Sequence, residues 1–121
     1  MAQRRMFSAL VVDTDDFTDM PTGAQALYFH LGMHGDDDGF VSSPNKIMRA
    51  AGCRQEDMEL LKGKGLVIQF PSGVVVMRDW RINNTLKNDR YHPTIYAEEK
   101  NQLITTPSGR YELKTREKFT V

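Results

Sequence analysis

The sequence predicts a small α+β domain, and three observations predict it. Residues 22–34 follow one helical pattern, shorter helical segments come after a polar turn at residues 36–39, and the apolar runs 66–70 and 74–77 flank Pro-Ser-Gly at residues 71–73. The last composition is typical of two paired strands around a short turn. With 121 residues, of which 40% are hydrophobic, the chain can bury one modest core without a metal or a disulfide.

The segment before the long helix predicts a short helix that ends near Pro21. Residues 13–17 offer N-cap chemistry for it, and Leu10, Val12 and Phe17 are expected to lie against the core.

Ala24, Leu27, Leu31 and His34 lie on one face of the long helix, with Tyr28 beside them. We therefore expect the core to form along this face.

The middle of the chain predicts two further helices and a small sheet. Residues 40–41 can form a very short strand that pairs with the hairpin. Serines 42 and 43 with Pro44 start a second helix, expected over residues 44–51 and ending at Gly52, and a third helix is expected over residues 55–64. The residues expected to be largely buried are Leu27, Leu31, Ile47, Met58, Leu61, Val67, Val75 and Trp80.

After the hairpin, residues 78–82 are expected to continue its second strand, with Trp80 and Ile82 on one face. Residues 83–93 are expected to be irregular, and a helix capped by Thr94 is expected over residues 94–103. This order is that of a winged helix, or winged helix-turn-helix, with a three-helix core, a small antiparallel hairpin sheet and an extra C-terminal helix. We divide the chain into this domain at residues 1–103 and a hairpin or mobile extension at residues 104–121.

The charge is balanced overall but unevenly distributed. Sixteen Lys and Arg residues match sixteen Asp and Glu residues. Residues 1–41 carry two basic and seven acidic side chains, whereas residues 42–92 carry nine basic and five acidic ones. The zero net charge argues against strong nonspecific binding to nucleic acid, and the basic middle favours one positive face. Attraction between the two halves across a subunit contact is the alternative.

Several classes of function are disfavoured by the residues themselves. Cys53 is the only cysteine, so we expect a small buried hydrophobe rather than a nucleophile, and no internal disulfide. No secretory signal and no transmembrane run is recognisable, so we expect a cytoplasmic protein without membrane contact. We identify no catalytic set and no phosphate-binding glycine loop, and we expect a protein that is not an enzyme and needs no cofactor.

The acidic run at residues 36–38 invites a calcium interpretation that its surroundings do not support. An EF-hand with Gly39 at its sixth position needs acids at its first and twelfth positions, where this chain has His34 and Asn45. His30 and His34 lack a third zinc ligand at a convincing spacing. We therefore expect a solvated turn and no metal.

The basic residues predict contacts to DNA phosphates more readily than reading of bases. The third helix would present Glu56 and Glu59, whose carboxylates repel phosphate, so only Arg54 and Gln55 at its start are candidates for the groove. Ordinary solvated charges are the alternative, with Arg81 or Arg90 paired to Asp79 or Asp89. The candidate DNA-binding residues are Lys46, Arg49, Arg54, Gln55, Arg78, Arg81, Lys87, Arg90 and, for stacking on a base or sugar, Tyr91.

Several blocks of the sequence together resemble a known family. They are residues 6–8, 16–17, 20–21, 24–31, 36–41, 73–76, 80–84 and 89–94. In this combination residues 4–103 resemble the N-terminal region of phage and prophage replisome organisers, replication-initiation proteins of Gram-positive hosts that are related in design to DnaD-like primosomal proteins.

The resemblance implies a winged-helix domain that helps to start DNA replication. It implies binding of origin DNA, self-association into a homo-oligomer, or recruitment of helicase-loading or primosomal partners, and it implies no catalytic residues. Two alternatives stay open: a protein-interaction module of the primosome with little DNA contact, and a winged-helix transcriptional regulator, since fold does not fix function.

Overall fold

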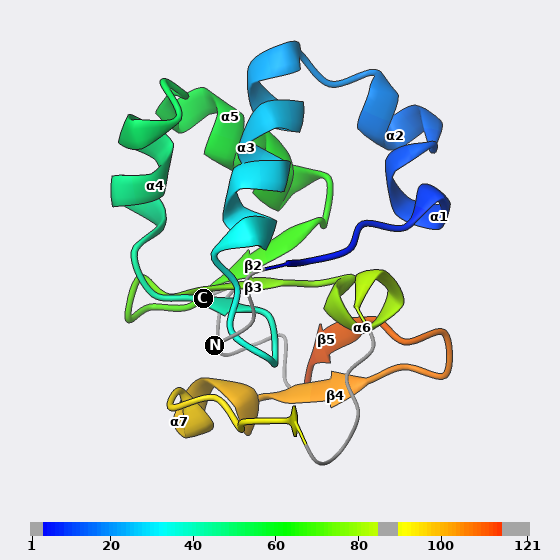
Figure 1. The fold of residues 1–121 in the computed structure, drawn as a ribbon, viewed down its shortest axis with the longest axis vertical. Coiled ribbons are helices and arrows are strands. Elements are labelled where there is room, and N and C mark those ends of the chain that lie inside the picture. Colours follow the sequence, from blue (N-terminus) through cyan, green and yellow to red (C-terminus); the bar gives the residue numbers. More distant parts are fainter. Residues whose placement is uncertain (1–3, 85–89, 115–121) are drawn as a thin grey trace.

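A computed structural model describes residues 4–84 and 90–114 of the chain (Figure 1). This part of the chain contains seven helices and two small antiparallel sheets, so the predicted α+β class is confirmed. The helices are α1 (Ala9–Val12), α2 (Asp15–Thr18), α3 (Thr22–Met33), α4 (Pro44–Ala50), α5 (Gln55–Gly63), α6 (Trp80–Asn83) and α7 (Ala97–Lys100). The strands are β1 (Phe40–Val41), β2 (Val67–Gln69), β3 (Val75–Met77), β4 (Leu103–Thr105) and β5 (Tyr111–Leu113).

The larger sheet has the strand order β1-β3-β2, with β3 in the centre. Val76 lies opposite Phe40 on one side and opposite Ile68 on the other. The turn between β2 and β3 has Gly73 at φ +93°, a backbone conformation that glycine adopts without steric cost. Both the predicted hairpin and its pairing with the short strand at residues 40–41 are confirmed.

The core lies between α3, α4, α5 and the larger sheet. Helix α3 packs against both α4 and α5, and its Leu27 and Leu31 are fully buried. All eight residues that were expected to be largely buried are buried. Apolar spacing was therefore sufficient to find the centre of the domain.

The C-terminal part of the described chain covers the other side of the larger sheet. In Figure 1 the helices α3, α4 and α5 lie on one side of β2 and β3, and α6, α7 and the β4–β5 hairpin lie on the opposite side. Leu103 and Tyr111 of this hairpin are buried, and the Tyr111 amide donates to the Arg78 carbonyl at 3.0 Å. The proposed division after residue 103 therefore falls at the first residue of β4.

The expected strand over residues 78–82 is wrong, because the chain turns into α6 after Met77. The helical turn lets Asn83 accept a hydrogen bond from the Ser8 amide and donate one to the buried Tyr28 hydroxyl, both at 2.8 Å. Trp80 is buried and Ile82 is only half-buried. The local sequence has a strand-like alternation, but the polar contacts of Asn83 require the helical turn.

The expected helix over residues 94–103 is reduced to α7, a single turn, and Thr94 does not cap it. The Thr94 hydroxyl instead donates to Asp36, far away in the sequence, and accepts from the Tyr96 amide. Leu103 starts β4, where it faces Leu113 of β5. Pairing with a distant strand has therefore overridden the helical pattern.

Two expectations for the N-terminal half also need correction. Leu10 was expected against the core, but it is 81% exposed on α1, while Phe17 is buried and Val12 is half-buried. His34 follows the last turn of α3 and is exposed instead of facing the core. No helix in the described part of the chain is long and apolar enough to cross a membrane.

Candidate nucleic-acid interface

Helix α4 carries two of the predicted DNA-contacting residues. Lys46 and Arg49 are exposed and three positions apart, which places them next to each other on the helix surface. Ile47 and Met48 are buried, and α4 packs on α3. Neither cation forms an ion pair with any described residue. Within the described ranges, no carboxylate therefore competes with a phosphate for either side chain.

Arg54 is the N-cap of α5 and Gln55 is its first residue. The two side chains differ in the contacts that they already make. Arg54 is exposed and makes no ion pair with a described residue, and its backbone amide donates to the Asp57 carboxylate at 2.9 Å. The Gln55 amide group already donates to Glu59 at 2.9 Å. That hydrogen bond, followed by the contact with Lys62, lowers the pKa of Glu59 below its usual value. The bond uses one of the two N–H donors of the Gln55 amide and orients that group toward Glu59.

Arg78 already binds the C-terminal hairpin. Its Nε donates to the Tyr111 carbonyl at 2.8 Å, and its Nη2 lies 3.5 Å from a Glu112 carboxylate oxygen. The side chain is partly buried. Arg78 therefore joins the end of β3 to β5.

Arg81 and Tyr91 both contact the same buried carboxylate, that of Asp38. The Tyr91 hydroxyl lies 2.8 and 2.7 Å from the two Asp38 oxygens, and Arg81 Nη2 lies 3.5 Å from one of them. The Arg81 guanidinium also lies 5.6 Å from the centre of the Tyr111 ring, but 44% of the side chain is exposed. Arg81 can reach solvent from this position, whereas the Tyr91 hydroxyl is occupied.

The turn at residues 36–39 is not the solvated turn that we expected, because the Asp38 side chain is completely buried. Besides Tyr91 and Arg81, it accepts hydrogen bonds from the Thr94 amide at 2.9 Å and from Lys100 Nζ at 3.2 Å. A buried carboxylate is stable only when it is paired and hydrogen-bonded in this way. The acidic turn is thus the point at which residues 91–100 attach to the domain.

The pKa values of two partners of Asp38, Tyr91 and Lys100, are raised. Burial and the neighbouring Asp38 raise the pKa of Tyr91, against the opposing effect of Lys100. Burial alone would lower the pKa of Lys100, but its bonds to Tyr91 and Asp38 outweigh that effect and raise the pKa. Tyr91 is therefore held protonated and Lys100 is held charged.

Two predicted DNA-contacting residues remain, Arg90 and Lys87. Arg90 is exposed and forms no ion pair with a described residue, and Lys87 lies outside the described residues. The alternative paired Arg81 or Arg90 with Asp79 or Asp89. For Asp79 it is wrong, because the Asp79 carboxylate binds Arg110 Nε at 2.6 Å, and Asp89 lies outside the described residues. Arg110 was absent from the sequence-based set.

Sequence reasoning missed the contacts of Asp38 because its partners lie more than forty residues away in the sequence. The acidic run and the segment around Tyr91 and Thr94 both attracted attention, but neither has a periodicity that pairs one with the other. Two further unpredicted pairs are Arg5 with Asp37 at 3.2 Å and Arg110 with Asp79. In the described ranges no three His, Cys, Asp or Glu side chains gather in a way that could hold a metal ion.

Comparison with known proteins adds no assignment to this geometry. No protein-family model, no curated protein and no solved structure matches the chain. A function can therefore be inferred only from the order of the elements, the chemistry of the surface and the resemblance in the sequence.

Proposed function

We propose that this chain is a non-enzymatic winged-helix module of a replication-initiation protein and that it contacts DNA through α4 and the start of α5. The observation that carries the proposal is the order α3-β1-α4-α5-β2-β3 with the sheet order β1-β3-β2. In this arrangement α4 and α5 are the helix-turn-helix pair, whose second helix approaches the major groove in the usual docking mode.

The distribution of unpaired cations supports the same surface. Lys46, Arg49 and Arg54 lie on or between α4 and α5, are exposed, and make no ion pair with a described residue. Two exposed acidic residues also lie on α5, Glu56 in its first turn and Glu59 in the next. Phosphate contact by α4 and by Arg54 therefore fits this surface better than deep insertion of α5 into a groove.

The role in replication is supported by the resemblance to replisome organisers. It carries with it the expectation of a homo-oligomer and of helicase-loading or primosomal partners. DNA binding by several weakly binding copies would suit a domain with zero formal net charge, since each copy contributes few phosphate contacts.

A pair of charge reversals tests the proposal. Glu56→Lys should strengthen binding to duplex DNA because it removes a repulsive charge from α5, and Lys46→Glu should weaken it. Mobility-shift titrations on both variants, with the oligomeric state measured in parallel, give the answer. If both variants bind DNA like the parent protein, the assigned surface is wrong.

A protein-interaction module is the second candidate, and exposed apolar side chains favour it. Leu10 is 81% exposed and Met33 is 49% exposed, on α1 and at the end of α3. In that case Leu10→Ser would change self-association or partner binding, while Lys46→Glu and Glu56→Lys would leave DNA affinity unchanged.

A further inference from the structure

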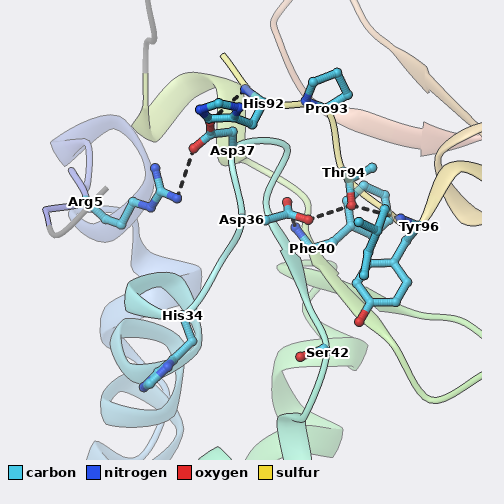
Figure 2. Close-up of a pocket in the computed structure, with 11 residues that line it drawn as sticks. Arg5, His34, Asp36, Asp37, Phe40, Ser42, His92, Pro93, Thr94 and Tyr96 are labelled. Carbon is cyan, nitrogen blue, oxygen red and sulfur yellow. Dashed lines mark hydrogen bonds and ion pairs between the residues drawn. The ribbon is translucent and has the colours of Figure 1, made fainter. Parts of the chain in front are cut away.

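A pocket of about 420 Å³ lies between the end of α3, the start of β1 and residues 92–96, away from the cations of α4 and Arg54. In Figure 2, Arg5 and His34 lie on one side, Thr94 and Tyr96 lie on the other, and Ser42 lies below. This volume is in the range of small-ligand sites, which are mostly apolar with a few polar groups.

The walls of the pocket suit a flat ligand. Tyr96 contributes a half-buried aromatic ring that packs on the buried ring of Phe40, and the exposed residues His34 and His92 also line the space. Aromatic and imidazole rings bind planar heterocycles by stacking. Pro93 and the 85% exposed Ile95 add further apolar surface.

The polar groups favour a ligand that donates hydrogen bonds and carries no phosphate inside the pocket. Among the described lining residues, the two carboxylates of Asp36 and Asp37 outnumber the one guanidinium, that of Arg5. A carboxylate has about four acceptor positions. Asp36 uses three of them within its own turn and for Thr94, whereas Asp37 uses two, for Arg5 and for the His92 amide. The Ser42 hydroxyl makes no hydrogen bond to a described residue.

One buried donor at the pocket has no partner among the described residues. The Arg5 side chain is only 7% exposed, and its Nε makes no hydrogen bond to residues 4–84 or 90–114. A buried donor without a partner is costly, and a ring nitrogen or carbonyl oxygen of a ligand near Arg5 would compensate it.

From these groups we infer that the pocket binds a nucleobase that carries an exocyclic amine. The base can come from a free nucleoside or from an unpaired position in a DNA strand, and both sources present the same flat ring with amine donors. The inference goes beyond phosphate contact by α4 and α5, because the free nucleoside can bind without any contribution from Lys46 or Arg49.

The single tryptophan provides the readout. Trp80 Nε1 donates to the Asp37 carbonyl, and the Arg5 guanidinium lies 5.0 Å from the centre of its ring, so Trp80 contacts two lining residues. Titration of the full chain with adenosine or cytidine should change its fluorescence and saturate. Thymidine, which lacks the amine, should bind about fivefold more weakly, the ratio expected for one hydrogen bond.

A blocking variant and its control make the test specific. Ser42→Phe should fill the pocket, since Ser42 is exposed and has room for a larger side chain, and should abolish the fluorescence change. Asn45→Phe, at an exposed position outside the lining, should leave it intact.

Duplexes with one unpaired adenine or one abasic position distinguish the two sources. Binding of the nucleoside assigns the free ligand, and preference for the adenine duplex without nucleoside binding assigns the strand, provided that Ser42→Phe removes it. If neither ligand binds, if thymidine equals adenosine, or if Ser42→Phe binds normally, the inference is overturned. If Lys46→Glu loses duplex binding but still binds the nucleoside, the inference about the pocket stands. That result would bear only on the DNA surface of α4 and α5.

Discussion

Gly39 meets two requirements at the turn before β1. Its φ of +90° lies in the left-handed region, and a Cβ atom there would lie 2.6 Å from Trp80 Cγ. Gly73 has φ +93°, but nothing lies within contact distance of a Cβ atom there. Gly73→Ala therefore measures the energetic cost of the backbone conformation alone. Gly39→Ala should reduce the free energy of unfolding by about 1 to 3 kcal/mol more than Gly73→Ala, because only the first also overpacks the core. Equal losses in urea unfolding would contradict this packing.

The buried tyrosines predict a loss of stability at alkaline pH. Burial raises the pKa of Tyr28 from 10.0 to about 12, and the pKa values of Tyr91, Tyr111 and Lys100 are also raised. Each group binds its proton more tightly in the folded state, so its contribution is complete below the unfolded pKa and is lost as the pH rises through the folded one.

For Tyr28 this window runs from about pH 10 to pH 12, and the loss is on the order of 2 to 3 kcal/mol. Urea unfolding of the parent protein and of Tyr28→Phe at several pH values checks it. The variant should show the smaller decline over this window, although it is less stable throughout because Asn83 loses a hydrogen-bond partner. The same slope in both proteins would mean that the Tyr28 hydroxyl ionises freely in the folded state.

At the scale of elements, α3 is the helix that the core depends on most. Leu31 is completely buried between the sheet and the other helices, whereas Met33, two residues later, is 49% exposed. Leu31→Ala should cost roughly 2 to 5 kcal/mol of unfolding free energy, because it removes buried methyl groups and leaves a cavity. Met33→Ala should cost under about 1 kcal/mol by the same denaturant measurement. A small loss at Leu31 would mean that α3 packs differently.

The elements that could be predicted are those fixed by local pattern. The spacing of Leu27 and Leu31 and the composition around Gly73 identified α3 and the β2–β3 hairpin because those signals come from adjacent residues. The elements that could not be predicted are fixed by distant partners. Asn83 holds α6 against Tyr28, and β4 forms only because β5 pairs with it. No local pattern specifies either partner.

The candidate DNA surface divides in the same way. Exposure of Lys46 and Arg49 follows from the helical period that buries Ile47 and Met48, so the sequence could identify them. Arg81 and Tyr91 contact Asp38, which lies more than forty residues away in the sequence. The sequence could not predict these contacts because no local pattern links residues so far apart. Charge alone does not distinguish a free cation from one that already has a partner.

At the scale of the whole molecule, the basic residues fall into two groups with different roles. Residues 91–100 attach to the domain through Asp38, and the β4–β5 hairpin attaches through Arg78 and Arg110. These cations stabilise the domain internally. Lys46, Arg49 and Arg54 make no ion pair with any residue that the structure describes, and the proposed DNA contact depends on these three cations.

The salt dependence of duplex-DNA affinity tests this account most directly. We predict that log affinity falls linearly with log salt concentration, and that Lys46→Ala and Arg49→Ala each make the slope shallower by about 0.9, the value for one lost phosphate contact. Lys114→Ala, which removes an equal charge from an exposed position after β5, should leave the slope unchanged. Equal slopes in the parent, Lys46→Ala and Arg49→Ala proteins would contradict the central claim that α4 contacts the DNA backbone.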